Sequence, residues 1–171
     1  MEVLAESQAI AGVSGQDRLI EFSFPSIAAT GLGRLIGQIC TSIPISIGGV
    51  QLSCLLFGLP VAPLGAAIYL GQKVFGDRYI ITNRAVEIRK SIGSSLVKRV
   101  ELANIADVTV SVQPGQAFSR AGNVELRDAK GSILATLNGV AWPERLKSAI
   151  MEARQARVSN DAALAQIQAR K

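Results

Sequence analysis

Histidine is absent from this 171-residue sequence, and only two cysteines, Cys40 and Cys54, are present. Protein zinc sites combine cysteine and histidine ligands, and a disulfide framework needs cysteines at regular spacings. No Cys-x-x-Cys motif occurs, and both cysteines lie in one apolar stretch, where cysteine usually behaves as a small apolar residue. We therefore expect no metal site, no cofactor and no disulfide scaffold.

Recognisable catalytic groups are also scarce. Asp107 has neither a second acid nor a histidine beside it, and general acid–base catalysis depends on a partnered, tuned group. The sequence contains no Gly-x-Ser-x-Gly or Ser-x-x-Lys motif. The glycine-bearing segments 12–18 and 31–37 do not follow a strand, as a dinucleotide-binding loop must. We expect that the protein is not an enzyme.

Charge is missing from one long stretch of the chain. Positions 35–72 are 38 consecutive residues without Asp, Glu, Lys or Arg. A helix needs about 20 apolar residues to cross a bilayer, so this stretch is too long for one crossing and suits two. Gly48 and Gly49 offer a turn near its middle. The sequence therefore predicts a transmembrane hairpin over residues 26–75, with helices from about 27 to 47 and from about 52 to 74.

Basic residues flank this uncharged stretch, with Arg34 before it and Lys73 after it. The formal net charge is +5, and the positive excess lies in the C-terminal half. Because cytoplasmic flanks of membrane helices are rich in Lys and Arg, we expect a multi-pass inner-membrane protein with a cytoplasmic second domain. An alternative is an interfacial first helix followed by a single span, since Gln38, Thr41 and Ser42 weaken the first helix.

The second half of the chain contains short runs in which apolar and polar residues alternate. Such runs separated by turn residues predict a β-sandwich or small barrel. Residues 19–25 suit either a short strand or an interfacial segment. Pro143 begins a helix with one apolar stripe, suited to the open end of the barrel, and a break is expected at 159–161. The six predicted strands are 78–82, 85–89, 96–102, 108–112, 123–127 and 132–137.

Three of these segments carry a resemblance to a known family. The first is Tyr-x-Ile-Thr-Asn followed by Arg, the second runs from Val100 to Val110, and the third is Gly-x-Val-x-Leu. Together with the helix pair and the Trp-Pro-started helix, they resemble the bacterial membrane-anchored pleckstrin-homology (PH) proteins over about residues 35–155. One departure is Ser-Ile-Gly-Ser-Ser-Leu-Val-Lys-Arg, where the family often has an arginine-rich strand. The matching residues are Tyr79, Thr82, Asn83, Arg84, Val100, Leu102, Ile105, Asp107, Val108, Val110, Gly122, Val124 and Leu126.

The resemblance implies a membrane-anchored α+β protein. A two-helix transmembrane hairpin would be followed by a PH-like bent sheet or barrel of seven strands, capped by a C-terminal helix. The expected divisions are an N-terminal cytoplasmic segment (1–25), the hairpin (26–75), the PH-like domain (77–157) and a C-terminal tail (158–171).

Two groups of residues are candidate sites. Arg89, Lys90, Lys98 and Arg99 flank the Ser/Gly loop 91–95. By analogy, this loop corresponds to the one that grips phosphates in eukaryotic PH domains, and basic side chains around such a loop suit an anionic lipid headgroup. The same cluster is also typical of a solvated hairpin tip beside a membrane. The second group, Phe118 and Arg120, is a candidate membrane or partner contact, although Phe118 would equally suit packing on the barrel.

We expect a membrane-anchored PH-like scaffold that serves as an accessory component of a membrane complex. Its expected partners are the lipid bilayer and either a membrane protein or a second copy, with no nucleic acid. One alternative is a sensor of anionic lipid headgroups. Another is an accessory subunit of a transport system, although the uncharged stretch lacks the ionisable residues that mark ion pathways.

Overall fold

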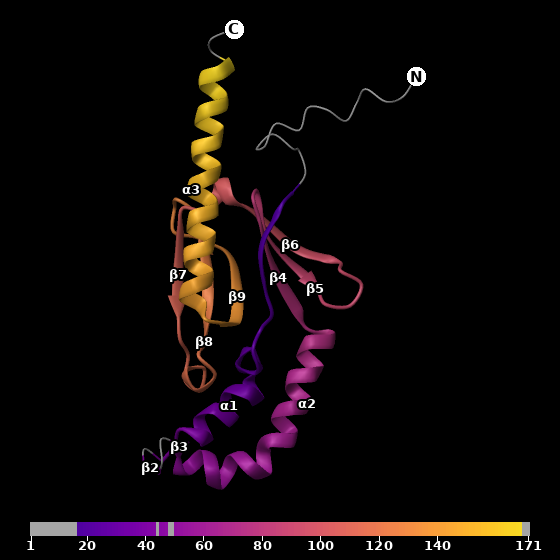
Figure 1. Ribbon diagram of the computed structural model, residues 1–171, viewed down its shortest axis with the longest axis vertical. Coiled ribbons are helices and arrows are strands. Elements are labelled where there is room, and N and C mark those ends of the chain that lie inside the picture. Colours follow the sequence, from indigo (N-terminus) through magenta and orange to yellow (C-terminus); the bar gives the residue numbers. More distant parts are fainter. Residues whose placement is uncertain (1–16, 44, 48–49, 169–171) are drawn as a thin grey trace.

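Two antiparallel sheets and a C-terminal helix form the body of the protein (Figure 1). The computed structural model describes residues 17–43, 45–47 and 50–168. The first sheet has the order β1-β4-β5-β6 and the second has the order β7-β8-β9. Their strands are β1 (Leu19–Ser23), β4 (Asp77–Thr82), β5 (Ala85–Lys90), β6 (Leu96–Glu101), β7 (Asp107–Ser111), β8 (Ala121–Arg127) and β9 (Ile133–Ala141).

The strands turn apolar side chains into one core, as the sequence pattern predicts, although β5 and β8 are buried on both faces over part of their length. On the first sheet, Ile81 and Val86 point into the core, and on the second sheet Leu126 and Leu137 do so. Full burial of such a side chain contributes about 1.5–3 kcal/mol. All six predicted strands are confirmed. The short 3₁₀ turn η3 (Leu102–Asn104) carries the chain from the first sheet to the second.

The seventh strand is β1, which the sequence left open as a strand or an interfacial segment. It pairs antiparallel with β4, with Phe22 opposite Ile80 and Ser23 opposite Tyr79. β1 therefore precedes the uncharged stretch in the sequence, and its neighbour in the sheet follows that stretch. The four strands of one sheet, the three of the other and the capping helix agree with the PH-like body that the resemblance implies.

Helix α3 (Pro143–Gln168) has two different halves. Its first half covers the core with Leu146, Ile150 and Ala153, and its second half projects beyond the sheets (Figure 1). The break predicted at 159–161 is wrong, because the helix continues through it. An ion pair one turn apart, between Arg157 Nε and Asp161 Oδ2 at 3.0 Å, supports the helix there.

The uncharged stretch folds into what we call the helical arm, defined as residues 31–75 apart from 44, 48 and 49. The arm lies at the end of the sheets opposite to the C-terminal half of α3 (Figure 1). A 3₁₀ turn, η1 (Ile27–Ala29), leads from β1 to the arm. The elements of the arm are α1 (Gly31–Cys40), β2 (Ser46–Ile47), β3 (Val50–Gln51), the π-helical turn η2 (Cys54–Gly58) and α2 (Leu59–Phe75).

The predicted transmembrane hairpin is wrong, and so is the multi-pass inner-membrane localisation that followed from it. Within the described residues, no helix has both the length and the apolar character needed to cross a membrane. α1 has 10 residues and α2 has 17, or about 15 Å and 25 Å at 1.5 Å per residue, against a hydrocarbon core of about 30 Å. The single-span alternative fails for the same reason.

Local chemistry explains why the first helix is short. The hydroxyl of Thr41 donates to the carbonyl of Gly37 at 2.9 Å, and that of Ser42 donates to Ile39 at 2.7 Å. These bonds close the last turn of α1, where a longer helix was expected. The predicted turn at Gly48 and Gly49 lies outside the described residues, as do residues 1–16 and 169–171 of the predicted terminal segments.

Candidate functional site at the base of the helical arm

The arm joins the sheets through two tight contacts, and the first is between two glycines. Gly37 of α1 faces Gly115 of the β7–β8 loop, and a β-carbon on Gly37 would overlap the carbonyl oxygen of Gly115. Arg34 of α1 also donates a hydrogen bond to the side chain of Gln113. The β7–β8 loop, which includes the 3₁₀ turn η4 (Ala117–Ser119), therefore packs directly on α1.

The second contact lies where α2 runs into β4. The backbone N–H of Ser91 donates to the carbonyl of Gly76 at 2.9 Å. The guanidinium of Arg78 donates to the hydroxyl of Ser94 at 2.7 Å. The β5–β6 loop is thereby held against the end of the arm. Both candidate loops, 91–95 and 113–120, thus lie at the same end of the protein, which we call the base of the arm.

The predicted basic cluster does not form one site. Arg89 and Arg99 both clasp the carboxylate of Glu87, with Nε–Oε2 and Nη1–Oε1 distances of 2.7 Å and 2.8 Å, and Glu87 is only 3% exposed. Arg99 also contacts Asp17 and Glu101, each at 2.8 Å. The hydrogen bonds that Arg99 donates, first to Glu101 and then to Asp17, raise the pKa of Arg99 further above its usual value. Arg89 and Arg99 are therefore engaged in holding the outer face of the first sheet together.

The two lysines of the cluster differ from these arginines. Lys90 pairs with Asp77 at 2.7 Å on the neighbouring strand. Lys98 is exposed, and the described part of the chain offers it no ion-pair partner. Ile92 on the β5–β6 loop and Leu96 at the start of β6 are also exposed. The sequence analysis missed these two residues, although Ile92 stands out as the one apolar residue within the Ser/Gly loop 91–95.

Phe118 and Arg120 also lie at the base, but they serve different neighbours. Phe118 is partly exposed on η4. The guanidinium of Arg120 lies over the ring of Trp142, 5.0 Å from its centroid, in a cation–π contact. Phe118 remains a candidate contact, whereas Arg120 belongs to the surface around the beginning of α3.

Helix α2, which connects the outer end of the arm to β4 at the base, has an unusual surface. α2 is apolar except for Gln72 and Lys73, yet none of its described side chains is buried. Phe75, at its end, is 73% exposed. A helix that is apolar on all sides is normally covered by a protein core or by lipid. α2 therefore presents a surface suited to an apolar surrounding.

Polar side chains at the outer end of the arm bond to the arm itself. Thr41 and Ser42 donate to carbonyls of α1, as described above. The hydroxyl of Ser53 is buried and donates to the carbonyl of Cys40. In an apolar surrounding, each hydroxyl without such a bond costs several kcal/mol. The arm is thus built so that these three hydroxyls do not need water.

Sheets of four and three antiparallel strands, closed by one C-terminal helix, define a PH-type binding module. The family model described as bacterial PH domain matches residues 28–157, and the chain belongs to this family. The match begins after β1, so the first strand of the sheet is recognised only in the structure. No curated protein sequence matches this chain. Family membership identifies the protein as an interaction module.

Proposed function

We propose that this interaction module attaches to a lipid bilayer by inserting the helical arm into one leaflet, without crossing the bilayer, and that it holds a partner protein there. One observation carries the proposal, namely that α2 is apolar, that none of its described side chains is buried, and that exposed apolar side chains surround most of it, apart from one half-buried stripe through Val61, Gly65 and Ile68. The satisfied hydroxyls at the outer end of the arm support it, because hydrocarbon leaves no water for unpaired polar groups.

The distribution of side chains around α2 favours lipid over a second protein. At about 100° per residue, Leu64 and Phe75 lie on one side, Tyr69 lies about 140° from Leu64, and Leu70 about 240°. All four are exposed. A single protein partner covers one stripe of a helix, whereas acyl chains surround it. The arm therefore fits a bilayer better than a dimer interface.

The base of the arm suits the headgroup layer. Lys73 lies in the last turn of α2, with its ammonium 5.6 Å from the centroid of the Tyr69 ring, and such aromatic and basic residues are typical of the interface. Lys98 and Ile92 lie on the adjoining β5–β6 hairpin. Each well-placed cation contributes about 1 kcal/mol toward an anionic surface. The base would then rest on headgroups while the arm enters the acyl chains.

Replacing both Leu64 and Leu70 by aspartate tests the insertion. On biological insertion scales each aspartate costs about 2.5–3.5 kcal/mol in the bilayer, so vesicle binding is expected to weaken more than a thousandfold. Flotation of the full chain with vesicles of phosphatidylcholine and phosphatidylglycerol measures this. Because both leucines are exposed, the variant is expected to fold.

The matched control is Val158→Asp on the projecting half of α3, because Val158 is 49% exposed and Leu64 is 50% exposed. This variant should float with the vesicles like the unmodified chain. If the double variant also floats, the arm does not insert. If the double variant instead converts a dimer into a monomer in sedimentation velocity, a second copy covers the arm.

Replacing Lys98 by glutamate tests the headgroup contact. The change of two charges at the base should cost about 2 kcal/mol on an anionic surface, or about thirtyfold in binding to vesicles rich in phosphatidylglycerol. Binding to phosphatidylcholine alone should hardly change. Lys130→Glu is the control, since Lys130 lies on the β8–β9 turn away from the arm (Figure 1). Equal losses in the two variants would argue that no particular face meets the headgroups.

A further inference from the structure

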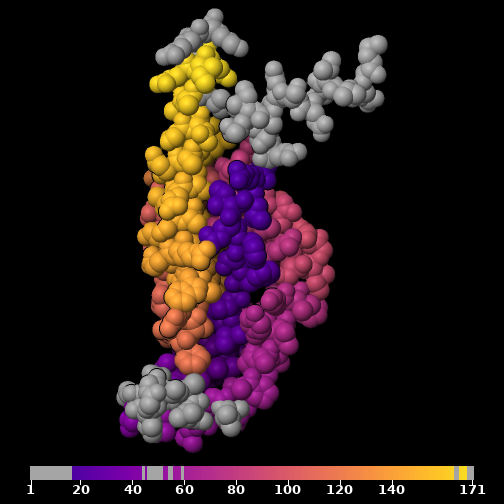
Figure 2. Space-filling model, in the orientation of Figure 1, coloured from indigo at the N-terminus to yellow at the C-terminus, as the bar shows by residue number. Residues whose placement is uncertain are grey.

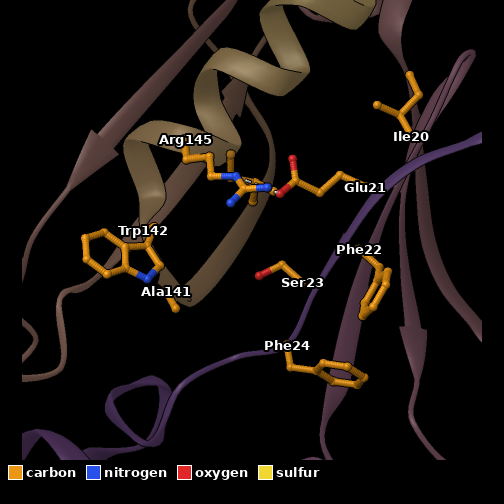
Figure 3. A pocket seen from close by; sticks show the side chains of 9 residues that line it. Ile20, Glu21, Phe22, Ser23, Phe24, Ala141, Trp142 and Arg145 are labelled. Carbon is orange, nitrogen blue, oxygen red and sulfur yellow. Dashed lines mark ion pairs between the residues drawn. The ribbon is translucent and has the colours of Figure 1, made fainter.

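A second surface lies between β1 and the beginning of α3 (Figure 3). A groove of about 490 Å³ is lined by residues 20–23 of β1 and Phe24 after it on one side, and by Ala141, Trp142, Arg145 and Leu146 on the other. Side chains of successive strand residues point to opposite faces of a sheet. A groove lined by five consecutive residues therefore runs along the edge of the strand.

The groove is closed at one end and open along its length. Pro25 forms a bridge with Val140 of β9, and the N–H of Ser26 donates to the carbonyl of Gly139 at 2.7 Å. On the N-terminal side of this bridge β1 and β9 separate, and the first turn of α3 takes the place of the neighbouring strand. Leu146, which is buried, supplies an apolar floor.

β1 is an edge strand whose outer edge faces this groove. In the sheets of the described residues its only strand neighbour is β4. Figure 2 shows β1 as an indigo band between α3 and the remaining strands of its sheet. Ile20 and Phe22 are exposed along it, and residues 19–23 contain neither the lysine nor the proline that usually guards an exposed edge.

The chemistry of the groove favours a segment that carries a carboxylate. Arg145 bridges the groove to Glu21, with 3.3 Å between Nε and Oε1, and its side chain is 78% exposed. An exposed ion pair of this kind contributes at most about 1 kcal/mol. Replacing Glu21 by a carboxylate of a bound segment as the partner of Arg145 therefore costs little free energy. The lining itself holds one cation, Arg145, and one acid, Glu21, and Arg120 outside the lining adds positive charge next to Trp142.

We propose that the groove binds an extended segment of a partner protein, which adds to β1 as a further strand and places a carboxylate on Arg145. β1 has five residues, so a bound strand of about the same length would match it. Apolar side chains of the segment would contact Phe24 and Trp142. This inference rests on the proposed role as an interaction module and names the chemistry of its partner, but it does not depend on insertion of the arm.

Displayed random octapeptides, selected on the full chain in mild detergent, test the inference without vesicles. Enriched peptides are expected to combine apolar residues with an acid. Trp142 is the only tryptophan in the sequence, so its emission should shift saturably when a capped synthetic copy of the most enriched peptide is added. Two further peptides would be methylated on alternate backbone nitrogens, one on the odd-numbered and one on the even-numbered positions. Only one of the two sets of N–H groups faces β1. One methylated peptide should therefore lose binding and the other should keep it.

Arg145→Glu is expected to weaken binding of the same peptide at least tenfold. Arg157→Glu on the same helix is the matched control and should leave binding unchanged. The proposal is overturned if no peptide is enriched, if Arg145→Glu binds as well as the unmodified chain, or if both methylated peptides behave alike. It is also overturned if sedimentation shows a dimer that the peptide does not dissociate, since β1 would then pair with a second copy. Vesicle flotation of Arg145→Glu should be normal, which separates this result from failure of the arm to insert.

Discussion

Replacing Ile150 by alanine is expected to lower the free energy of unfolding by about 2–5 kcal/mol. Ile150 is 0% exposed and lies on the first half of α3, within the core shared by the two sheets. Removing three carbons there loses apolar burial and leaves a cavity that close-packed neighbours fill only in part. Urea denaturation of the full chain, followed by far-ultraviolet circular dichroism, measures the loss.

Ile167→Ala provides the control on the same helix. Ile167 is 59% exposed on the projecting half of α3, where a substitution usually changes stability by less than about 0.5 kcal/mol. The contrast between the two variants therefore depends on which half of α3 belongs to the core. Similar losses in both variants would contradict the division of the helix into a packed half and a projecting half.

Raising the pH from 10 to 12 is expected to remove about 2–3 kcal/mol of stability through Tyr79 alone. Burial, as the main cause, raises the pKa of Tyr79 from 10.0 to about 12, with a smaller contribution from Asp77 and an opposing one from the backbone of Asn138. The folded protein thus holds the phenolic proton more tightly than the unfolded chain does. This contribution is complete below pH 10 and is lost as the pH rises through 12, at about 1.4 kcal/mol per pKa unit.

Tyr79→Phe separates this effect from the titration of lysines, which both proteins share. The hydroxyl of Tyr79 donates to the carbonyl of Asn138 and accepts from its N–H, both at 3.0 Å. Losing both bonds should cost about 1–3 kcal/mol at pH 7. Between pH 10 and 12 the phenylalanine variant should then lose less stability than the unmodified chain. Parallel losses in urea denaturation over this range would show that the phenol is not protected by burial.

The body of the fold could be predicted because apolar and polar residues alternate along most of its strands. Val108, Val110 and their neighbours alternate cleanly, so the period alone indicates a strand. β1 lacks this pattern. Leu19, Ile20 and Phe22 place apolar side chains on both faces, since one edge of the strand lines a groove. The sequence pattern therefore could not decide between a strand and an interfacial segment for these residues. Only the pairing with β4 in the structure identifies them as a strand.

The helical arm shows how much of a structure can be predicted from a stretch without charged residues. Thirty-eight uncharged residues indicate an apolar surrounding, but they do not fix the lengths of helices. Hydroxyl groups of Thr41 and Ser42 end α1 early, and Pro60 and Pro63 lie in the first turn and a half of α2. These local bonds and the missing N–H groups compete with a continuous helix. The sequence predicted two long helices because apolar composition was weighed above these signals.

The four residues of the basic cluster were grouped because they lie close together in the sequence. Their roles depend on which residues face each other across the β5–β6 ladder. Glu87 lies opposite Arg99 in the β5–β6 ladder, which brings Arg99 within reach of the buried carboxylate. Asp17, far away in the sequence, joins them through β1. Lys98 lies on the opposite face of β6 and takes no part in this network. Strand register is a tertiary property, so the sequence alone could not separate the engaged arginines from Lys98.

One strand belongs to both surfaces described above. β1 leads into the arm, and its outer edge forms one wall of the groove, while its ladder with β4 closes a loop of about 55 residues. Closing a loop of that length costs roughly 2 kcal/mol more than closing a four-residue turn, so we expect β1 to join the sheet after the hairpins β4–β5 and β5–β6. Any surrounding that orders the arm reduces this cost, and a segment bound along β1 does the same from the other side. Because both events stabilise the state in which β1 is paired, we expect each to favour the other by an equal factor, so that the protein would hold its partner most firmly where its arm is embedded.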